Sequence, residues 1–202
     1  MFAPRAARRS LERYRRKGLD RLERMMLRSA AAGRLEGRRV LEIGGGIGIL
    51  QSELLEAGAA RGEVVELVAA YEPYARELAR DRGFQDRTSF RVADVLDQPD
   101  VADPAEIVVL NRVVCCSPDG VRLTGVAARL AQGTLVLSFP RDRLVVRVGI
   151  CLLNAWLWIV RRSFRVFLHP RAALFAAAEA EGLRLSEENR VRFWEFASLR
   201  RP

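Results

Sequence analysis

A run of glycines follows an acid in the segment Glu42-Ile43-Gly44-Gly45-Gly46-Ile47-Gly48. Because glycine has no Cβ, its backbone can approach a nucleotide closely and adopt the positive φ angles of a tight turn. An apolar strand pattern precedes the run and a helical pattern follows it, and strand-to-helix turns of this kind bind nucleotides. The segment therefore predicts a nucleotide-binding turn. Its candidate residues are Glu42, Gly44, Gly45, Gly46 and Gly48.

The spacing of the glycines separates two kinds of nucleotide site. Dinucleotide-binding turns need G-x-G-x-x-G/A, but the last position is Ile49 when counted from Gly44 and Gln51 when counted from Gly46. A phosphate-binding G-x-x-x-x-G-K-[ST] loop is excluded as well, because no lysine follows the glycines. The pattern that remains is E-x-G-x-G-x-G at the end of a strand.

A second acid, Glu66, stands about 20 residues after Gly46, the spacing at which an acid at the next strand end binds ribose hydroxyls. It interrupts the apolar run 64–68, where an unpaired carboxylate would be costly. An ordinary acid on a helix surface or at a strand edge is the alternative. A third acid, Asp94, follows the strand pattern of residues 88–93 and is followed by Val95. Its alternative is an Asp that simply begins a loop.

These features resemble class I S-adenosylmethionine (SAM)-dependent methyltransferases, with residues 42–48 matching their motif I. The resemblance covers about residues 38–139 and implies SAM as the cofactor. It implies that Glu66 binds the ribose, that Asp94 recognises the adenine amino group, and that Val95 packs on the adenine ring. Asn111, at the end of the fourth strand, would face the methyl donor.

The residues after Asn111 limit the range of possible methyl acceptors. Arg112 and Val113 stand where amino-group methylases of DNA and of protein glutamine have prolines, so that chemistry is disfavoured. The pair Cys115-Cys116 lacks the Pro-Cys order of cytosine-C5 enzymes, and we expect it to be structural.

The sequence assigns no catalytic group, since methyl transfer needs an in-line geometry and only sometimes a base. Tyr14 and His169 are weak catalytic candidates. Together with Arg15 and Arg112 they are the candidates for the acceptor side. Tyr14 could instead belong to an apolar helix stripe, and His169 could simply precede a helix that begins at Pro170.

The elements that must position these residues alternate between strands and helices. This pattern predicts an α/β fold, a Rossmann-like sheet that is mostly parallel, with a C-terminal antiparallel strand and helices on both faces. An amphipathic helix from Ser10 to about Gly33 lies within an N-terminal segment 1–37, and residues 38–202 form the SAM-binding domain. Strands are expected at 38–43, 63–68, 88–93, 106–110, 134–139, 183–187 and 190–197, and helices at 49–57, 74–82, 120–130 and 170–181.

An apolar helical insertion is expected at residues 144–168. Its part 162–170, following an apolar helix, is similar to the same region of magnesium-protoporphyrin O-methyltransferases. Residues 144–160 are too short and too polar for a transmembrane helix. They could form a lid over an apolar acceptor, a cap on the sheet, or a peripheral membrane contact.

Composition limits the partners. The net charge of +9 would suit nucleic acid, but it comes almost entirely from arginines spread along the chain, so a dedicated nucleic-acid surface is disfavoured. Three cysteines and one histidine support neither a disulfide framework nor a metal site. With no apolar segment after residues 1–9, we expect a cytoplasmic protein. No pattern in the chain indicates its oligomeric state.

The function expected from the sequence is SAM-dependent methyl transfer (EC 2.1.1.-) to a small-molecule acceptor, at oxygen. Two alternatives stay open. One is methylation of RNA or protein, which the positive charge favours and which predicts binding that weakens steeply with salt. The other is a non-catalytic protein that binds SAM or another nucleotide.

Overall fold

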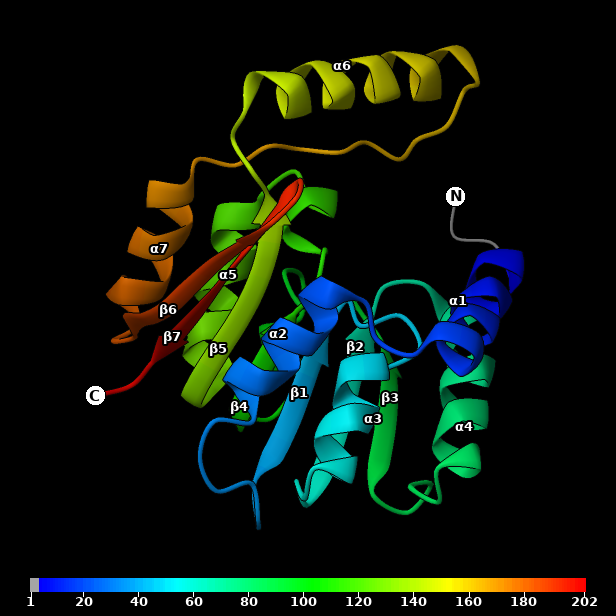
Figure 1. The fold of residues 1–202 in the computed structure, drawn as a ribbon, viewed down its shortest axis with the longest axis vertical. Helices are drawn as coiled ribbons and strands as arrows, with labels where there is room; N and C mark the ends of the chain where they lie inside the picture. The colour runs from blue at the N-terminus through cyan, green and yellow to red at the C-terminus, as the bar shows by residue number, and fades with distance from the viewer. Residues whose placement is uncertain (1–3) are drawn as a thin grey trace.

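The computed structural model describes residues 4–202, which form one seven-stranded sheet in the order β3-β2-β1-β4-β5-β7-β6 (Figure 1). Strands β1 to β5 are parallel neighbours, and β7 runs antiparallel to both β5 and β6. The predicted mostly parallel sheet with a C-terminal antiparallel strand is therefore confirmed. The strands are β1 (Arg39–Ile43), β2 (Arg61–Glu66), β3 (Thr88–Val92), β4 (Ala105–Leu110), β5 (Ala131–Pro140), β6 (Arg184–Val191) and β7 (Trp194–Arg200).

Helices cover both faces of the sheet, as predicted. On one face, side chains such as Leu11, Met26 and Leu54 form an apolar cluster with Ile107 and Val109 of β4. A second cluster on the other face joins the remaining strand residues to two later helices. The first face carries α1 (Pro4–Lys17), α2 (Arg21–Ala30), α3 (Ile49–Glu56) and α4 (Glu72–Asp81), and the second carries α5 (Gly120–Leu130) and α7 (Arg171–Ala180). Three short 3-10 helices are η1 (Ala69–Tyr71), η2 (Pro99–Val101) and η3 (Val114–Cys116).

The prediction of one N-terminal helix from Ser10 to about Gly33 is wrong. The structure has two helices, because Gly18 adopts a positive φ of 61° after α1 and Asp20 then starts α2. Asp20 accepts a hydrogen bond from the Glu23 backbone N–H at 3.0 Å, and the Glu23 carboxylate accepts one from the Asp20 N–H at 2.7 Å. This reciprocal cap satisfies two amide groups and stabilises a new helix start. Residues 1–3 of the predicted segment 1–37 lie outside the described residues.

The C-terminal hairpin is confirmed, but its turn lies later than predicted. The strand breaks expected near residues 188 and 189 fall inside β6, and the chain turns at Arg192, which has a φ of 51°. Residues 184–190 of β6 are all exposed, and most of them are polar. In the sequence, such a polar stretch is typical of a turn rather than of a strand.

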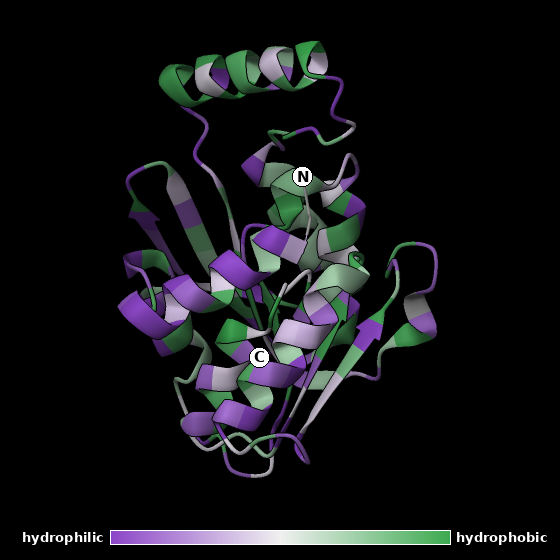
Figure 2. Ribbon diagram, turned by 90° about the vertical axis from the view of Figure 1, so that its right-hand side faces the viewer, coloured by the Kyte–Doolittle hydropathy of each residue, from purple (hydrophilic) through white to green (hydrophobic). Residues whose placement is uncertain are grey.

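The apolar segment after β5 forms α6 (Leu144–Ile159), which stands apart from the rest of the molecule (Figures 1 and 2). Residues 162–169 run back beneath it and are called the strap here. Asn154 ties α6 to the strap by donating to the Val166 carbonyl at 2.8 Å and accepting from the Val166 N–H at 2.9 Å. Across residues 4–202, none of the helices combines the length and the apolar character needed to cross a bilayer.

Candidate functional site

The glycine run forms the turn between β1 and α3 at the carboxyl edge of the sheet. Gly44, Gly46 and Gly48 have φ angles of 64°, 60° and 74°, a region in which residues with a Cβ are strained. A Cβ on Gly44 would lie 2.2 Å from Val113 Cγ2, and one on Gly48 would lie 2.9 Å from Val64 Cγ2. Glycine is therefore required here by backbone conformation and by close packing.

Glu66 ends β2 beside this turn. One carboxylate oxygen accepts from the Gly46 N–H at 2.9 Å, and the other accepts from the Val68 N–H at 3.1 Å. The side chain is 8% exposed, and this burial raises the pKa of Glu66 despite the N–H groups, which act in the opposite direction. The structure thus joins two sequence candidates, the glycine turn and the acid about 20 residues later, in one hydrogen-bonded unit.

Glu42 lies underneath the turn. Its carboxylate accepts from the Gln51 N–H at 2.9 Å, near the start of α3. A Cβ on Gly45 would lie 2.5 Å from Glu42 Cγ, so the turn packs directly on this side chain. Burial raises the pKa of Glu42 to about 8. Glu42 therefore supports the turn from below.

The end of β3 places Asp94 and Val95 differently. Asp94 is half-buried and accepts from the Leu96 N–H at 2.9 Å, whereas Val95 is buried in the apolar core. The apolar side chain presented beside Glu66 is Leu67, which is 65% exposed. Sequence reasoning missed Leu67. The signal for it was an apolar residue directly after the acid at a strand end.

Tyr71 is the second residue that the sequence reasoning missed. A Cβ on Gly46 would lie 3.4 Å from the Tyr71 ring, so this ring borders the turn. Burial raises the pKa of its hydroxyl. An aromatic five residues after Glu66, in an acid-and-proline segment, carries no pattern that marks it as part of a site.

Asn111 and Arg112 follow β4 and are held through Ser138 of β5. The Ser138 hydroxyl donates to Asn111 Oδ1 at 3.1 Å and accepts from the Arg112 N–H at 2.8 Å. Arg112 has a φ of 58°, and its guanidinium pairs with Asp20 at 2.6 Å and lies 5.3 Å from the centre of the Trp194 ring. Arg112 therefore links the carboxyl edge to the N-terminal cap of α2.

Tyr14 and Arg15 are placed elsewhere. The Tyr14 hydroxyl hydrogen-bonds to Glu53 of α3 and to Arg82, which follows α4, at 2.5 Å. Burial raises the pKa of this hydroxyl. Arg15 pairs with Glu77 at 2.7 Å and with Asp81, both on α4. These contacts join α1 to α3 and α4 rather than to the glycine turn.

His169 closes the strap against the segment that follows β4. Its Nε2 lies 3.0 Å from the Ser117 carbonyl, and its ring stacks on Phe167 at 6.3 Å between centres. A Cβ on Gly120 would lie 2.5 Å from the His169 ring, so the histidine is tightly packed. It also borders a cavity of about 280 Å³ that includes Phe139 and Arg143.

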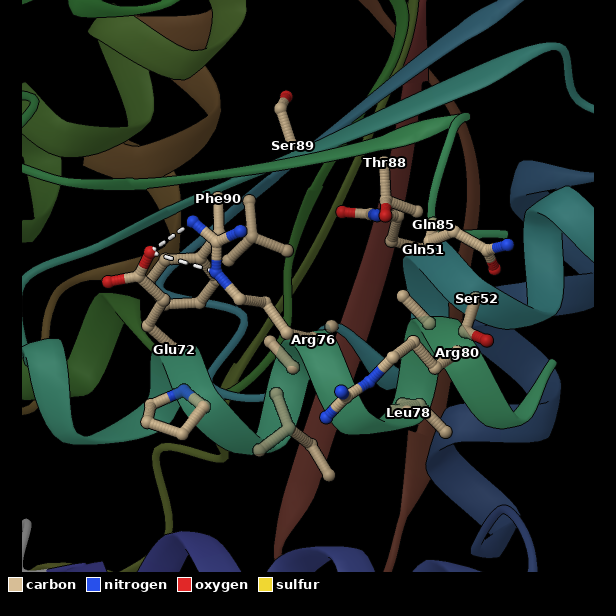
Figure 3. Close-up of a pocket in the computed structure, with 16 residues that line it drawn as sticks. Gln51, Ser52, Glu72, Arg76, Leu78, Arg80, Gln85, Thr88, Ser89 and Phe90 are labelled. Carbon is tan, nitrogen blue, oxygen red and sulfur yellow. Dashed lines mark hydrogen bonds and ion pairs between the residues drawn. The ribbon is translucent and has the colours of Figure 1, made fainter. Parts of the chain in front are cut away.

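A larger cavity of about 720 Å³ lies between α4 and the outer strands β2 and β3 (Figure 3). Gly48 and Gln51 border it, while Phe90 and Arg76 lie across it in the view of Figure 3. Glu66, Asp94 and Asn111 are not among its lining residues. The cavity thus shares one end of the glycine turn but is separate from the acids at the carboxyl edge.

Comparisons with known proteins identify the fold. No model of a known family matches the sequence, and no curated protein sequence matches it. Among solved structures, magnesium protoporphyrin IX methyltransferase (ChlM) from Synechocystis PCC 6803 with bound SAH is 18% identical, with a TM-score of 0.69 over 96% of this chain and 94% of that chain. The mitomycin 7-O-methyltransferase MmcR is 23% identical, with a TM-score of 0.64 over 89% of this chain and 54% of that chain.

A third similar structure is the [4+2]-cyclase SpnF, at 14% identity and a TM-score of 0.67, over 90% of this chain and 80% of that chain. The chain therefore has the Rossmann-like fold of class I methyltransferases, as the sequence predicted. Similar folds carry different reactions in these structures, so the reaction must be argued from the site.

Proposed function

We propose that the chain binds SAM at the carboxyl edge of the sheet and transfers its methyl group to an oxygen of a small-molecule acceptor. The observation that carries this proposal is the hydrogen bond between Glu66 and the Gly46 N–H, within a turn of three glycines at positive φ. It brings an acceptor for ribose hydroxyls to a backbone that has no Cβ in the way.

The residues present fit this cofactor. Both Glu66 oxygens already accept an N–H, and each carboxylate oxygen keeps a further lone pair for a hydroxyl. Asp94, half-buried at the end of β3, can accept from the adenine amino group. Leu67 offers an exposed apolar surface for the ring, a role that we assign to it in place of the buried Val95. The glycine turn, above Glu42, would approach the rest of the cofactor.

When bound, SAM would supply a methyl group from a positively charged sulfur, and the neutral thioether left after the S–CH3 bond breaks would be the leaving group. The chain then has to hold the acceptor in line and keep water away. Asn111 is fixed by Ser138 and can orient a polar group at this edge. Arg112 and His169 are the acceptor-side candidates that we retain, because both are fixed to the segments that follow β4. We assign Tyr14 and Arg15 to the support of α1, and no general base.

The proposal of a small-molecule acceptor is supported by the names of proteins with a similar fold. Two of the similar structures are named as methyltransferases of small molecules, and one of these names gives oxygen as the target. A second candidate function is SAM binding without methyl transfer, because one structure with a similar fold is named as a [4+2]-cyclase and not as a methyltransferase. The two functions predict equal affinity for SAM but differ in whether SAM is consumed.

Calorimetry on the Glu66→Gln and Asp94→Asn variants tests the cofactor site. Each change should weaken SAM binding at least about fivefold, equivalent to about 1 kcal/mol for a lost hydrogen bond to a carboxylate. Glu63→Gln is the matched control, since Glu63 is also a buried acid of β2 but pairs with Arg91. Its SAM affinity should be unchanged.

Turnover is then measured with labelled SAM and a small-molecule extract of the host. Transfer of label to a small molecule supports the methyltransferase, and SAM binding without transfer supports the second candidate. Binding of NAD in place of SAM would contradict both.

A further inference from the structure

Exposed apolar side chains are concentrated on α6. Figure 2 shows this helix as a mostly hydrophobic rod held away from the body. Leu144 is 77% exposed and Trp158 is 72% exposed. The exposed large apolar residues of this segment are Leu144, Val145, Val148, Leu152, Trp156, Trp158, Ile159 and Val160. Water is a poor solvent for such a surface, and a patch of this kind marks a contact site.

The chain itself does not cover this surface. The inner side of α6 is partly covered: Leu157 is buried, Val146, Ile150, Leu153 and Asn154 are partly buried, and Asn154 makes two hydrogen bonds to Val166 of the strap. In the part of the chain that the structure describes, no α6 residue belongs to either apolar core cluster. The strap therefore holds the helix in place and leaves its outer face free.

Arginines flank the apolar helix at both ends, and one of them, Arg147, lies in its first turn. Three stand between 141 and 147 and three between 161 and 165, whereas the only acid from 141 to 165 is Asp142. Asp142 pairs with Arg147 at 2.5 Å, which leaves the segment strongly cationic. The flanking arginines are Arg141, Arg143, Arg147, Arg161, Arg162 and Arg165.

We propose that α6 docks on the surface of an anionic phospholipid bilayer, with its axis in the plane of the membrane. Apolar side chains enter the boundary between headgroups and acyl chains, and the arginines at both ends bind lipid phosphates. Trp156 and Trp158 suit this boundary because tryptophan prefers the membrane interface. The helix is too short to span a bilayer and long enough to lie on one.

Charge argues against a second copy of the chain as the occupant. In a symmetric dimer in which the two copies of α6 pack on each other, arginine-rich ends would meet arginine-rich ends, with one acid per segment to offset them. Lipid phosphates neutralise the same charges without that repulsion. An anionic bilayer therefore satisfies both the apolar face and the flanking cations.

Vesicle co-sedimentation of the full chain, without SAM, tests the proposal. We expect binding to vesicles of phosphatidylcholine with phosphatidylglycerol, a blue shift of tryptophan emission, and at least about tenfold weaker binding to phosphatidylcholine alone. The apolar variant Leu152→Ser/Trp158→Ser and the charge variant Arg161→Glu/Arg162→Glu should each lose binding at least about tenfold.

The controls are matched. Leu185→Ser removes an exposed apolar residue of β6, and Arg34→Glu/Arg184→Glu changes net charge as much as the charge variant does. Both controls should bind as the unchanged chain does, and a thermal melt should show all variants folded. Equal loss in controls and α6 variants, no binding to anionic vesicles, or an α6-dependent dimer in sedimentation would each overturn the proposal. Because SAM is left out, the result is independent of the proposed function.

Discussion

Glu42 is a carboxyl group with almost no contact with water, placed between the glycine turn and the start of α3. Its N–H donor from Gln51 offsets only part of the cost of burying a charge, so the folded chain holds the proton up to a pH of about 8. The unfolded chain releases the same proton near its ordinary value of 4.5. Protonation of this residue and folding are therefore coupled.

The sign of this coupling gives a prediction. Since the folded-state pKa is raised, the stabilisation is fully present below the unfolded pKa and is lost as pH rises through the folded pKa. Between about pH 5 and 8, the free energy of unfolding should fall by up to about 1.4 kcal/mol per pH unit.

Urea unfolding of the unchanged chain and of Glu42→Gln at several pH values checks this. Glutamine keeps an acceptor for the Gln51 N–H but has no proton to lose, so the variant should show a flatter dependence. An identical pH dependence in both proteins would show that Glu42 is not the group responsible.

At this scale the sequence could identify the residues whose role follows from backbone geometry. A cluster of glycines after an apolar strand and an acid at the end of the next apolar strand are rare unless something requires them, so Gly46 and Glu66 were predictable. The solvent exposure of the apolar residues that follow the acids was not predictable. Val95 and Leu67 are both apolar residues after an acid, and only the structure shows that the first is buried and the second is not.

The turn between β1 and α3 requires glycine for two reasons, a positive φ and close packing. Substitutions can measure the two separately. Gly44 and Gly18 both have positive φ, but a Cβ on Gly44 meets Val113, whereas one on Gly18 meets nothing within 4 Å. Gly18→Ala should cost about 1 kcal/mol for its backbone conformation. Gly44→Ala should cost about 1–3 kcal/mol more, for the clash.

Chemical unfolding of both variants measures this difference, and a third variant tests its cause. Val113→Ala removes the methyl groups that the new Cβ would meet, so Gly44→Ala/Val113→Ala should recover part of the loss. Equal costs for Gly18→Ala and Gly44→Ala would mean that the packing of Val113 is unimportant.

Elements were predictable where apolar periodicity was strong. The predicted ends of helices and strands were wrong where polar side chains determine them. The break between α1 and α2 depends on the reciprocal cap of Asp20 and Glu23, in a stretch whose apolar spacing continues across Gly18. The predicted position of the hairpin turn was wrong for a related reason. β6 is exposed and carries polar residues typical of a turn.

At the scale of the whole molecule, α6 lies outside the sheet and the helices that cover its two faces, while the strap returns to them at His169. Replacing residues 144–160 with a short glycine-serine linker should therefore leave a folded chain that binds SAM with nearly unchanged affinity. Methyl transfer to an apolar acceptor should fall if the segment serves the acceptor.

Thermal unfolding and calorimetry with SAM check this deletion. The matched deletion removes β7, residues 194–200, which lies between β5 and β6 and should abolish folding. Loss of folded protein in the α6 deletion would show that α6 is a cap on the sheet.

The sheet architecture was predictable because alternation of strand and helix restricts a chain to few topologies. The position of α6 was not. Its apolar composition predicts burial, whereas most of its large apolar side chains are exposed, and the two hydrogen bonds by which Asn154 joins it to the strap have no signature in the sequence.

The strand order also has a consequence for synthesis. β5 is complete at residue 140, but the strand that covers its free edge, β7, begins only at residue 194. During translation, the long apolar strand β5 therefore has unpaired backbone groups along this edge until β7 has been synthesised. These unpaired groups favour pairing with other nascent chains. We expect slow translation or chaperone depletion to increase aggregation of this protein, and an added peptide of the β7 sequence to reduce it.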